Sequence, residues 1–228
     1  MAEYELNGVA VVAVGSFNPA IFHPRWLSEN ELLAANEAEH ALEAVVLSPQ
    51  LTTFTADWLN LQVTTEQAIF STIEEAHELE LRDLARGTLD LLPHTPVDAL
   101  GLNADSHFRV DSEAEWHAVG DQFLPKDFWE PLFEGEEWIR RDGGEATGLR
   151  GLKVEAWRTN KRDYVRIEVA PSARLKPWGV YVGINAHYQL TEGDDRGTGH
   201  RAAQAILENW DAIRDFEHQI QQVLLRGV

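Results

Sequence analysis

Two stretches of this sequence carry the same pattern: VDALGLNADSHFRV at residues 97–110 and GVYVGINAHYQL at residues 179–190. Each begins as an apolar strand, passes through Gly-(Leu or Ile)-Asn-Ala, and ends in a histidine followed by an aromatic residue. Asp105-Ser106 is an insertion in the first copy. A glycine inside a strand marks a bulge or the close approach of another backbone. The pattern predicts two strands in similar environments and favours an internal duplication.

The repeat also matches four polar residues, Asn103 with Asn185 and His107 with His187. One interpretation is a ligand site between the two repeated strands, with the asparagines paired across a groove and the histidines acting as ligands or a general base. The other interpretation is structural, because asparagine commonly bonds to nearby backbone at a bulge and a histidine at a strand end is often only partly exposed. The sequence leaves both interpretations open.

Periodicity assigns the rest of the chain to strands and amphipathic helices. The apolar run at 9–14 predicts a strand buried on both faces. Capping boxes at Ser28 with Glu31 and at Ser112 with Glu115 predict helices that begin after each serine, the first over 29–43. Further elements are expected as strands at 45–47, 51–63, 68–73, 152–157 and 164–170, and as helices at 74–92 and 200–225.

These elements predict an α+β fold in which antiparallel sheet is covered by long amphipathic helices. The polar, glycine-rich run at 140–148 is the clearest linker, so we expect an N-terminal half at 1–139 and a C-terminal half at 149–228 that share one core. Each half is interpreted as a duplicated unit of sheet plus helix.

Composition and charge narrow the function. The chain has 228 residues, 44% of them hydrophobic, with no cysteine and a formal net charge of −19. The absence of cysteine excludes disulfides and thiolate metal sites, and the acidic balance disfavours direct binding to nucleic acid. The N-terminus lacks the features of a secretory signal and no apolar run reaches the length of a membrane span, so we expect a cytoplasmic protein without a membrane partner.

The densest aromatic stretch lies at 116–138, among prolines and charged residues. Aromatic side chains dominate the energetics of protein interfaces, so this stretch is a candidate surface for another protein. The alternative is a connector that folds back and buries its rings. The candidate partner-binding residues are Trp116, Phe128, Trp129, Phe133 and Trp138.

A search for catalytic motifs finds none that is complete. Gly143 and Gly148 have the spacing of a phosphate loop, but Leu149-Arg150 stands where lysine and serine or threonine are required. No two of the nine histidines are spaced as neighbouring ligands on one element. We therefore expect no metal, no cofactor and no catalytic residue.

The sequence favours a non-catalytic protein-binding module: an adaptor, an assembly or chaperone-like factor, or a subunit of a bacterial complex. Antiparallel strands followed by a long amphipathic helix form an arrangement that resembles export-chaperone-type proteins, at the level of fold and without matching residues. We expect a protein partner in a homo-oligomer or hetero-complex, and the acidic charge is compatible with a basic one. Two alternatives stay open: an enzyme or small-ligand binder using Asn103, His107, Asn185 and His187, and an acidic mimic of DNA.

Overall fold

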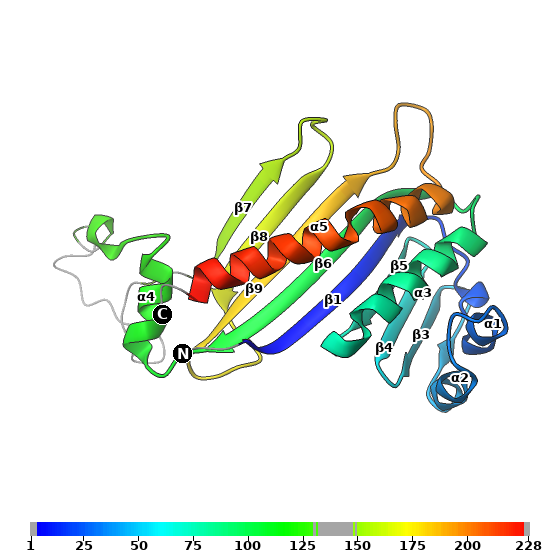
Figure 1. Cartoon of the computed structure of the whole chain (residues 1–228), viewed down its shortest axis with the longest axis horizontal. Coiled ribbons are helices and arrows are strands. Elements are labelled where there is room, and N and C mark those ends of the chain that lie inside the picture. Colours follow the sequence, from blue (N-terminus) through cyan, green and yellow to red (C-terminus); the bar gives the residue numbers. More distant parts are fainter. Residues whose placement is uncertain (1–3, 130, 132–147, 149, 226–228) are drawn as a thin grey trace.

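A computed structural model describes residues 4–129, 131, 148 and 150–225. This part of the chain is α+β, as the sequence predicts, and is built on one antiparallel sheet in the order β2-β3-β4-β5-β1-β6-β9-β8-β7. Figure 1 shows the sheet with its helices, which are α1 (Pro24–Glu29), α2 (Ala35–Leu42), α3 (Glu78–Leu91), α4 (Glu113–Asp121) and α5 (Gly199–Leu225).

Three long strands, β1, β6 and β9, form the centre of the sheet, and shorter strands extend it on both sides. The strands are β1 (Tyr4–Gly15), β2 (Val46–Leu47), β3 (Leu51–Ala56), β4 (Leu59–Thr64), β5 (Gln67–Thr72), β6 (Val97–Arg109), β7 (Leu152–Trp157), β8 (Tyr164–Pro171) and β9 (Gly179–Gln189). The strand assignments at 68–73, 152–157 and 164–170 are confirmed, as is the long C-terminal helix.

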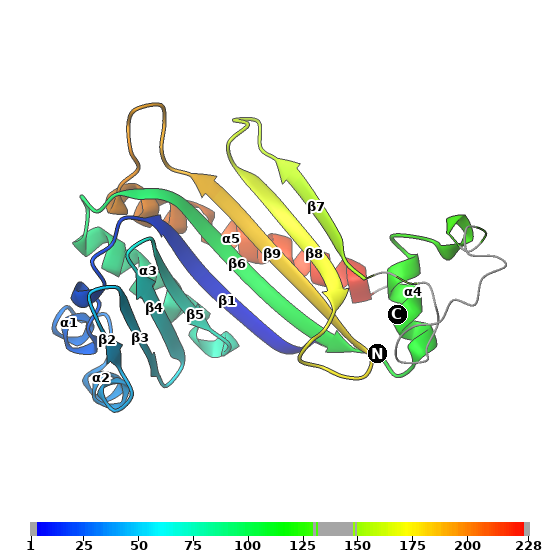
Figure 2. The same cartoon turned by 180° about the vertical axis from the view of Figure 1, so that it is seen from behind.

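Side chains alternate between two faces along the strands. In β4, for example, Leu59, Leu61 and Val63 are buried while Asn60 and Gln62 are exposed. Residues directly opposite each other in an antiparallel pair point to the same side, so the strand register carries this alternation across the sheet. Helices α3 and α5 lie on the side of the buried set (Figure 1), and the view from behind shows the strands in front of α5 (Figure 2).

We call the side of the sheet away from α5 the open face. We define it by fourteen outward side chains of β3, β4, β5, β1, β6 and β9, which the register places in neighbouring rows. Its members are Ala10, Val12, Thr53, Thr55, Asn60, Gln62, Gln67, Ile69, Ser71, Asn103, Asp105, Asn185, His187 and Gln189. All of them are partly or fully exposed.

The core lies between the sheet and its helices. The apolar stripe of α5, with Ile206, Trp210 and Ile213, is buried in one cluster with Leu100 and Leu102 of β6. A second cluster at the far end of the same helix includes Phe108, Val180, Val182 and Leu224. Burial of each large apolar side chain contributes about 1.5 to 3 kcal/mol, so α5 is integral to the fold.

The two copies of the sequence repeat form adjacent strands, β6 and β9, with Asn103 directly opposite Asn185. A different correspondence appears in the topology. Across the sheet, the set β3-β4-β5-β1 and the set β7-β8-β9-β6 have the same order of strands. The strand that comes last in the chain in each set, β5 or β9, precedes a helix on the buried side, α3 or α5. The sets meet where β1 pairs with β6. The repeated stretches are therefore the first and last strands of one set, not equivalent strands of two.

Three predictions about local structure are wrong. The strand expected over 51–63 is a hairpin of β3 and β4, with a turn at Asp57, whose φ is 43°. Instead of one helix over 29–43 there are two, α1 and α2. Pro24 occupies the first helical position of α1, and Glu31 adopts a φ of 61°, which cannot continue a helix. The run at 9–14 is not buried on both faces, since Val14 is 43% exposed. The strand is central, but helices lie on one side of it.

The predicted linker at 140–148 lies outside the described residues apart from Gly148, so the boundary between the halves stays a prediction. Strands from both sides of it nevertheless belong to one sheet, because β6 pairs with β9 over eleven residue pairs. The capping box at Ser112 is confirmed as a helix start: the Ser112 hydroxyl accepts the Glu115 backbone N–H at 3.2 Å.

Candidate functional site

The open face of β6 and β9 brings together two of the predicted ligand residues. The side chains of Asn103 and Asn185 are hydrogen-bonded, with the Asn185 amide donating to Asn103 Oδ1. Both lean over Gly101, where an added Cβ would lie 3.3 Å from Asn185 Nδ2 and 3.4 Å from Asn103 Oδ1. Glycine at this position thus leaves room for the two paired amides. The asparagines bond to each other across adjacent strands, whereas the first sequence interpretation paired them as ligands and the second bonded each to nearby backbone.

His187 lies one row away on the same face, opposite Gly101. Its ring stacks on Tyr164 of β8 with centroids 4.7 Å apart and planes at 12°. Tyr164 in turn contacts Trp157 of β7, which is 58% exposed. The three rings form an aromatic row that runs from the centre of the sheet to its β7 edge.

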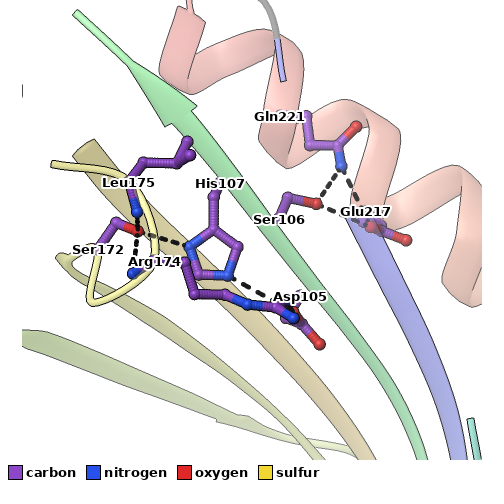
Figure 3. A network of polar contacts seen from close by, with 8 residues as sticks. All are labelled: Asp105, Ser106, His107, Ser172, Arg174, Leu175, Glu217 and Gln221. Carbon is purple, nitrogen blue, oxygen red and sulfur yellow. Dashed lines mark hydrogen bonds and ion pairs between the residues drawn. The ribbon is translucent and has the colours of Figure 1, made fainter. Parts of the chain in front are cut away.

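His107 belongs to a different environment, shown in Figure 3. It lies near the end of β6 and is only 4% exposed. Its Nδ1 is 2.9 Å from Ser172 Oγ, and the Ser172 hydroxyl also accepts the backbone N–H groups of Arg174 and Leu175 at 3.1 and 2.9 Å. The hydroxyl therefore donates its proton to Nδ1, which fixes the ring proton on Nε2.

The charged neighbours of His107 are Asp105 and Arg174. Asp105 Oδ2 is 3.7 Å from His107 Nε2 and 3.9 Å from the Arg174 guanidinium. Burial lowers the pKa of His107 below its ordinary value of 6.5, and Arg174 acts in the same direction, while Asp105 opposes them. The ring is held as the neutral imidazole that its hydrogen bond with Ser172 requires.

Serine, histidine and aspartate in this sequence of contacts resemble a hydrolytic triad, but the geometry of Ser172 does not fit a nucleophile. Ser172 is 6% exposed, and its oxygen already accepts two backbone N–H groups. A nucleophile needs a free lone pair directed at an accessible substrate carbon. The network instead anchors the turn after β8 to β6.

The four predicted ligand residues share one face but do not form one site. His187 is opposite Gly101, and His107 is opposite Tyr181. Six residues of extended strand separate these positions along β6, about 20 Å at the usual rise per residue. Asn103, Asn185 and His187 are neighbours, whereas His107 is buried beneath the turn that holds Ser172.

A second polar network on the opposite side of β6 was missed by sequence reasoning. Glu217 of α5 is 2% exposed and is hydrogen-bonded by Gln221 Nε2 at 3.1 Å and by Ser106 Oγ at 3.4 Å (Figure 3). Arg214 forms an ion pair with Glu217 and a second one, at 2.6 Å, with Glu78 of α3. The sequence did contain a sign of this buried carboxylate, because Glu217 follows Ile213 by four residues and therefore lies within the apolar stripe of the helix.

The aromatic residues predicted to bind a partner are only partly described. Trp116 is half-buried, and its indole N–H donates to the Gly179 carbonyl at 3.1 Å. Trp129 is 37% exposed. The other three lie beyond the side chains that the structure describes: Phe128, Phe133 and Trp138. Binding through this set stays a prediction.

Comparison with known proteins found no matching family and no significantly similar curated protein. In the described ranges, no three histidine or carboxylate side chains are placed to hold a metal ion. None of the helices described is long and apolar enough to cross a membrane.

Proposed function

We propose that this chain is a non-catalytic protein-binding module and that the open face is its binding surface. The observation that supports the proposal is the near absence of charge there. Among the fourteen members of the open face defined above, Asp105 alone carries a formal charge, in a chain with 38 acidic and 19 basic residues. Arg109 lies on the same side of the sheet at the end of β6, outside these rows, and pairs with Glu5 at 3.6 Å. Depletion of charged residues is the compositional signal of an interface core.

Charges reappear at the β7 edge of the sheet, where they are paired within the molecule. Arg166 binds Glu155 at 2.7 Å and Lys153 binds Glu168 at 3.2 Å. The uncharged region is thus bordered by neutralised pairs on one side. Threonine, asparagine, glutamine and small apolar side chains suit a partner that presents an uncharged strand or sheet surface.

The same topology supports the proposal of internal duplication. Two sets of four strands with one order, each preceding a helix, are what fusion of two copies of a sheet-plus-helix unit would produce. In that arrangement the open face is formed jointly by both units across β1 and β6. The alternatives keep their own tests: a ligand site at Asn103 and Asn185 predicts saturable binding of a small molecule, and a DNA mimic predicts partner binding that weakens steeply with salt.

Site-specific photo-cross-linking tests the open face. Benzoylphenylalanine replaces Ser71 in one variant and Leu207, which is 57% exposed on α5, in a matched control. We expect a stoichiometric adduct with one protein at Ser71 and none at Leu207, in the native host. Adducts at Leu207 alone would move the binding surface to the helix side, and no adduct at either position would count against a binding module.

A second experiment tests whether complex formation requires the open face to be uncharged. Ser71→Lys places a cation at the centre of the open face without entering the core, because Ser71 points away from it. We expect the unfolding midpoint to stay unchanged and the complex to be lost. A complex that survives Ser71→Lys would contradict the proposed surface.

A further inference from the structure

A groove of about 670 Å³ lies between the α1–α2 connection, the turn from β3 to β4, and the start of α3. Its volume is within the usual range of ligand sites. It is separate from the open face, since no member of that face lines it. The residues that line it are Ser28, Glu31, Leu32, Leu33, Ala34, Ala35, Glu37, Trp58, His77, Glu80, Asp83 and Leu84.

The lining combines an apolar wall with carboxylates. Leucine, alanine and tryptophan side chains supply the wall, and four carboxylates accompany them, while no lysine or arginine occurs among the described lining residues. Trp58 is 6% exposed and stacks on His77 with centroids 5.3 Å apart and planes at 7°. The aromatic wall is therefore rigid and already in place.

Glu37 is the carboxylate whose position is most firmly fixed. Its Oε1 accepts the Trp58 indole N–H at 2.9 Å, and its Oε2 accepts the Ala34 backbone N–H at 3.0 Å. Both donors are neutral, and within the described residues Glu37 forms no ion pair. By contrast, Glu80 contacts His77 at 2.6 Å and Asp83 contacts Arg82 at 2.9 Å. The groove thus holds a preorganised negative charge that no cation of the described chain neutralises.

We propose that this groove docks a basic side chain, arginine or lysine, presented by a partner protein. Such side chains carry a cation on an apolar stem, and the stem suits the leucine and tryptophan wall while the cation suits Glu37. Remaining carboxylates at Glu31 and Glu80 favour further basic residues beside the docked one. A divalent metal fits less well, because in the described residues no three histidine or carboxylate side chains are placed to hold one. The net charge of −19 steers basic segments toward the molecule.

The probe is the blocked tripeptide acetyl-Gly-Arg-Gly-amide, with its neutral citrulline counterpart as control. Binding is followed at constant ionic strength by the NMR signal of the Trp58 indole N–H, assigned with Trp58→Phe. We expect a saturable shift with the arginine and the corresponding lysine peptide and none with citrulline. An equal response to citrulline, or tighter binding of free spermidine than of either basic peptide, would overturn the proposal.

Two substitutions on α2 separate a specific site from general attraction. Glu37→Gln removes the anchored charge, and Glu39→Gln removes the same charge from an exposed neighbour that does not line the groove. We expect about a tenfold weaker affinity for Glu37→Gln, as for loss of one charge-assisted contact, and no change for Glu39→Gln. An equal loss of affinity in both variants would show that binding depends on the net charge of the protein and not on Glu37, and would overturn the proposal.

If Glu37→Gln disturbs α2, which circular dichroism would reveal, Glu31→Gln at the rim provides a second variant. It should weaken binding while leaving the fold intact. Because the groove and the open face share no residue, Ser71→Lys should leave tripeptide binding unchanged. Loss of peptide binding in the groove and loss of partner binding at the open face can therefore be measured separately.

Discussion

At the scale of single residues, the environment of Ser172 decides its role more than its neighbours' identities do. Serine, histidine and aspartate are in contact, yet the serine oxygen accepts the N–H groups of Arg174 and Leu175 and is buried. A buried hydroxyl whose oxygen already accepts two backbone N–H groups and whose proton is directed at His107 is not accessible to a substrate carbon. The contacts of one oxygen thus distinguish an anchored turn from a nucleophile.

His107 should make the stability of the protein depend on pH. Burial lowers the pKa of His107 in the folded state below 6.5, its ordinary value. The unfolded chain therefore binds the proton first as pH falls. The contribution of the neutral ring is complete above pH 6.5 and is lost as pH falls from there toward the folded pKa. We expect the free energy of unfolding to decline over this interval.

The matched variant is His107→Asn, whose Oδ1 can accept the Ser172 hydroxyl but cannot titrate. Urea denaturation of both proteins from pH 7.5 to pH 5 measures the difference, with Asp105 and Arg174, the charged groups facing His107, present in both. A slope identical in the two proteins would show that His107 does not titrate in this range.

At the scale of elements, α5 is fixed to β6 and α3 by an ionic network inside its apolar stripe. Glu217→Ala should lower the free energy of unfolding by about 3 kcal/mol, because it breaks the buried ion pair with Arg214 and leaves the Ser106 hydroxyl without its acceptor, while Gln221 keeps its hydrogen bond to Ser106 at 2.7 Å. Glu217→Gln keeps the shape and should cost less. Urea denaturation followed by circular dichroism measures both, and a cost for Glu217→Ala below about 0.5 kcal/mol would rule out the network as a structural anchor.

At the scale of the whole molecule, the sheet joins the two predicted halves. β1 pairs with β6, and β6 pairs with β9 from beyond the predicted linker. We expect one cooperative unfolding transition, with equal calorimetric and van't Hoff enthalpies, because neither half can lose its strands without exposing the other. Two separate transitions in calorimetry would instead indicate that residues 1–139 and 149–228 fold as independent domains.

The elements were predictable where a pattern is local and repeated. The alternation of Leu59, Leu61 and Val63 and the stripe of the C-terminal helix fixed the type of element and the face that is buried. Prediction failed where two local signals competed. Ser28 and Glu31 have the spacing of a capping box, but a helix has already begun at Pro24. The backbone of Glu31 is left-handed, so no helix continues through it.

By itself, the sequence determined the α+β class, most strands and the C-terminal helix, because side-chain periodicity reports which face of an element leaves water. Only the tertiary structure decided which strands pair, which brought Asn103 opposite Asn185, buried His107 beside Ser172 and gathered the uncharged open face. The physical reason is that strand pairing, burial and hydrogen bonding depend on residues far apart in the chain, such as Asn103 and Asn185. A local sequence pattern does not identify those partners.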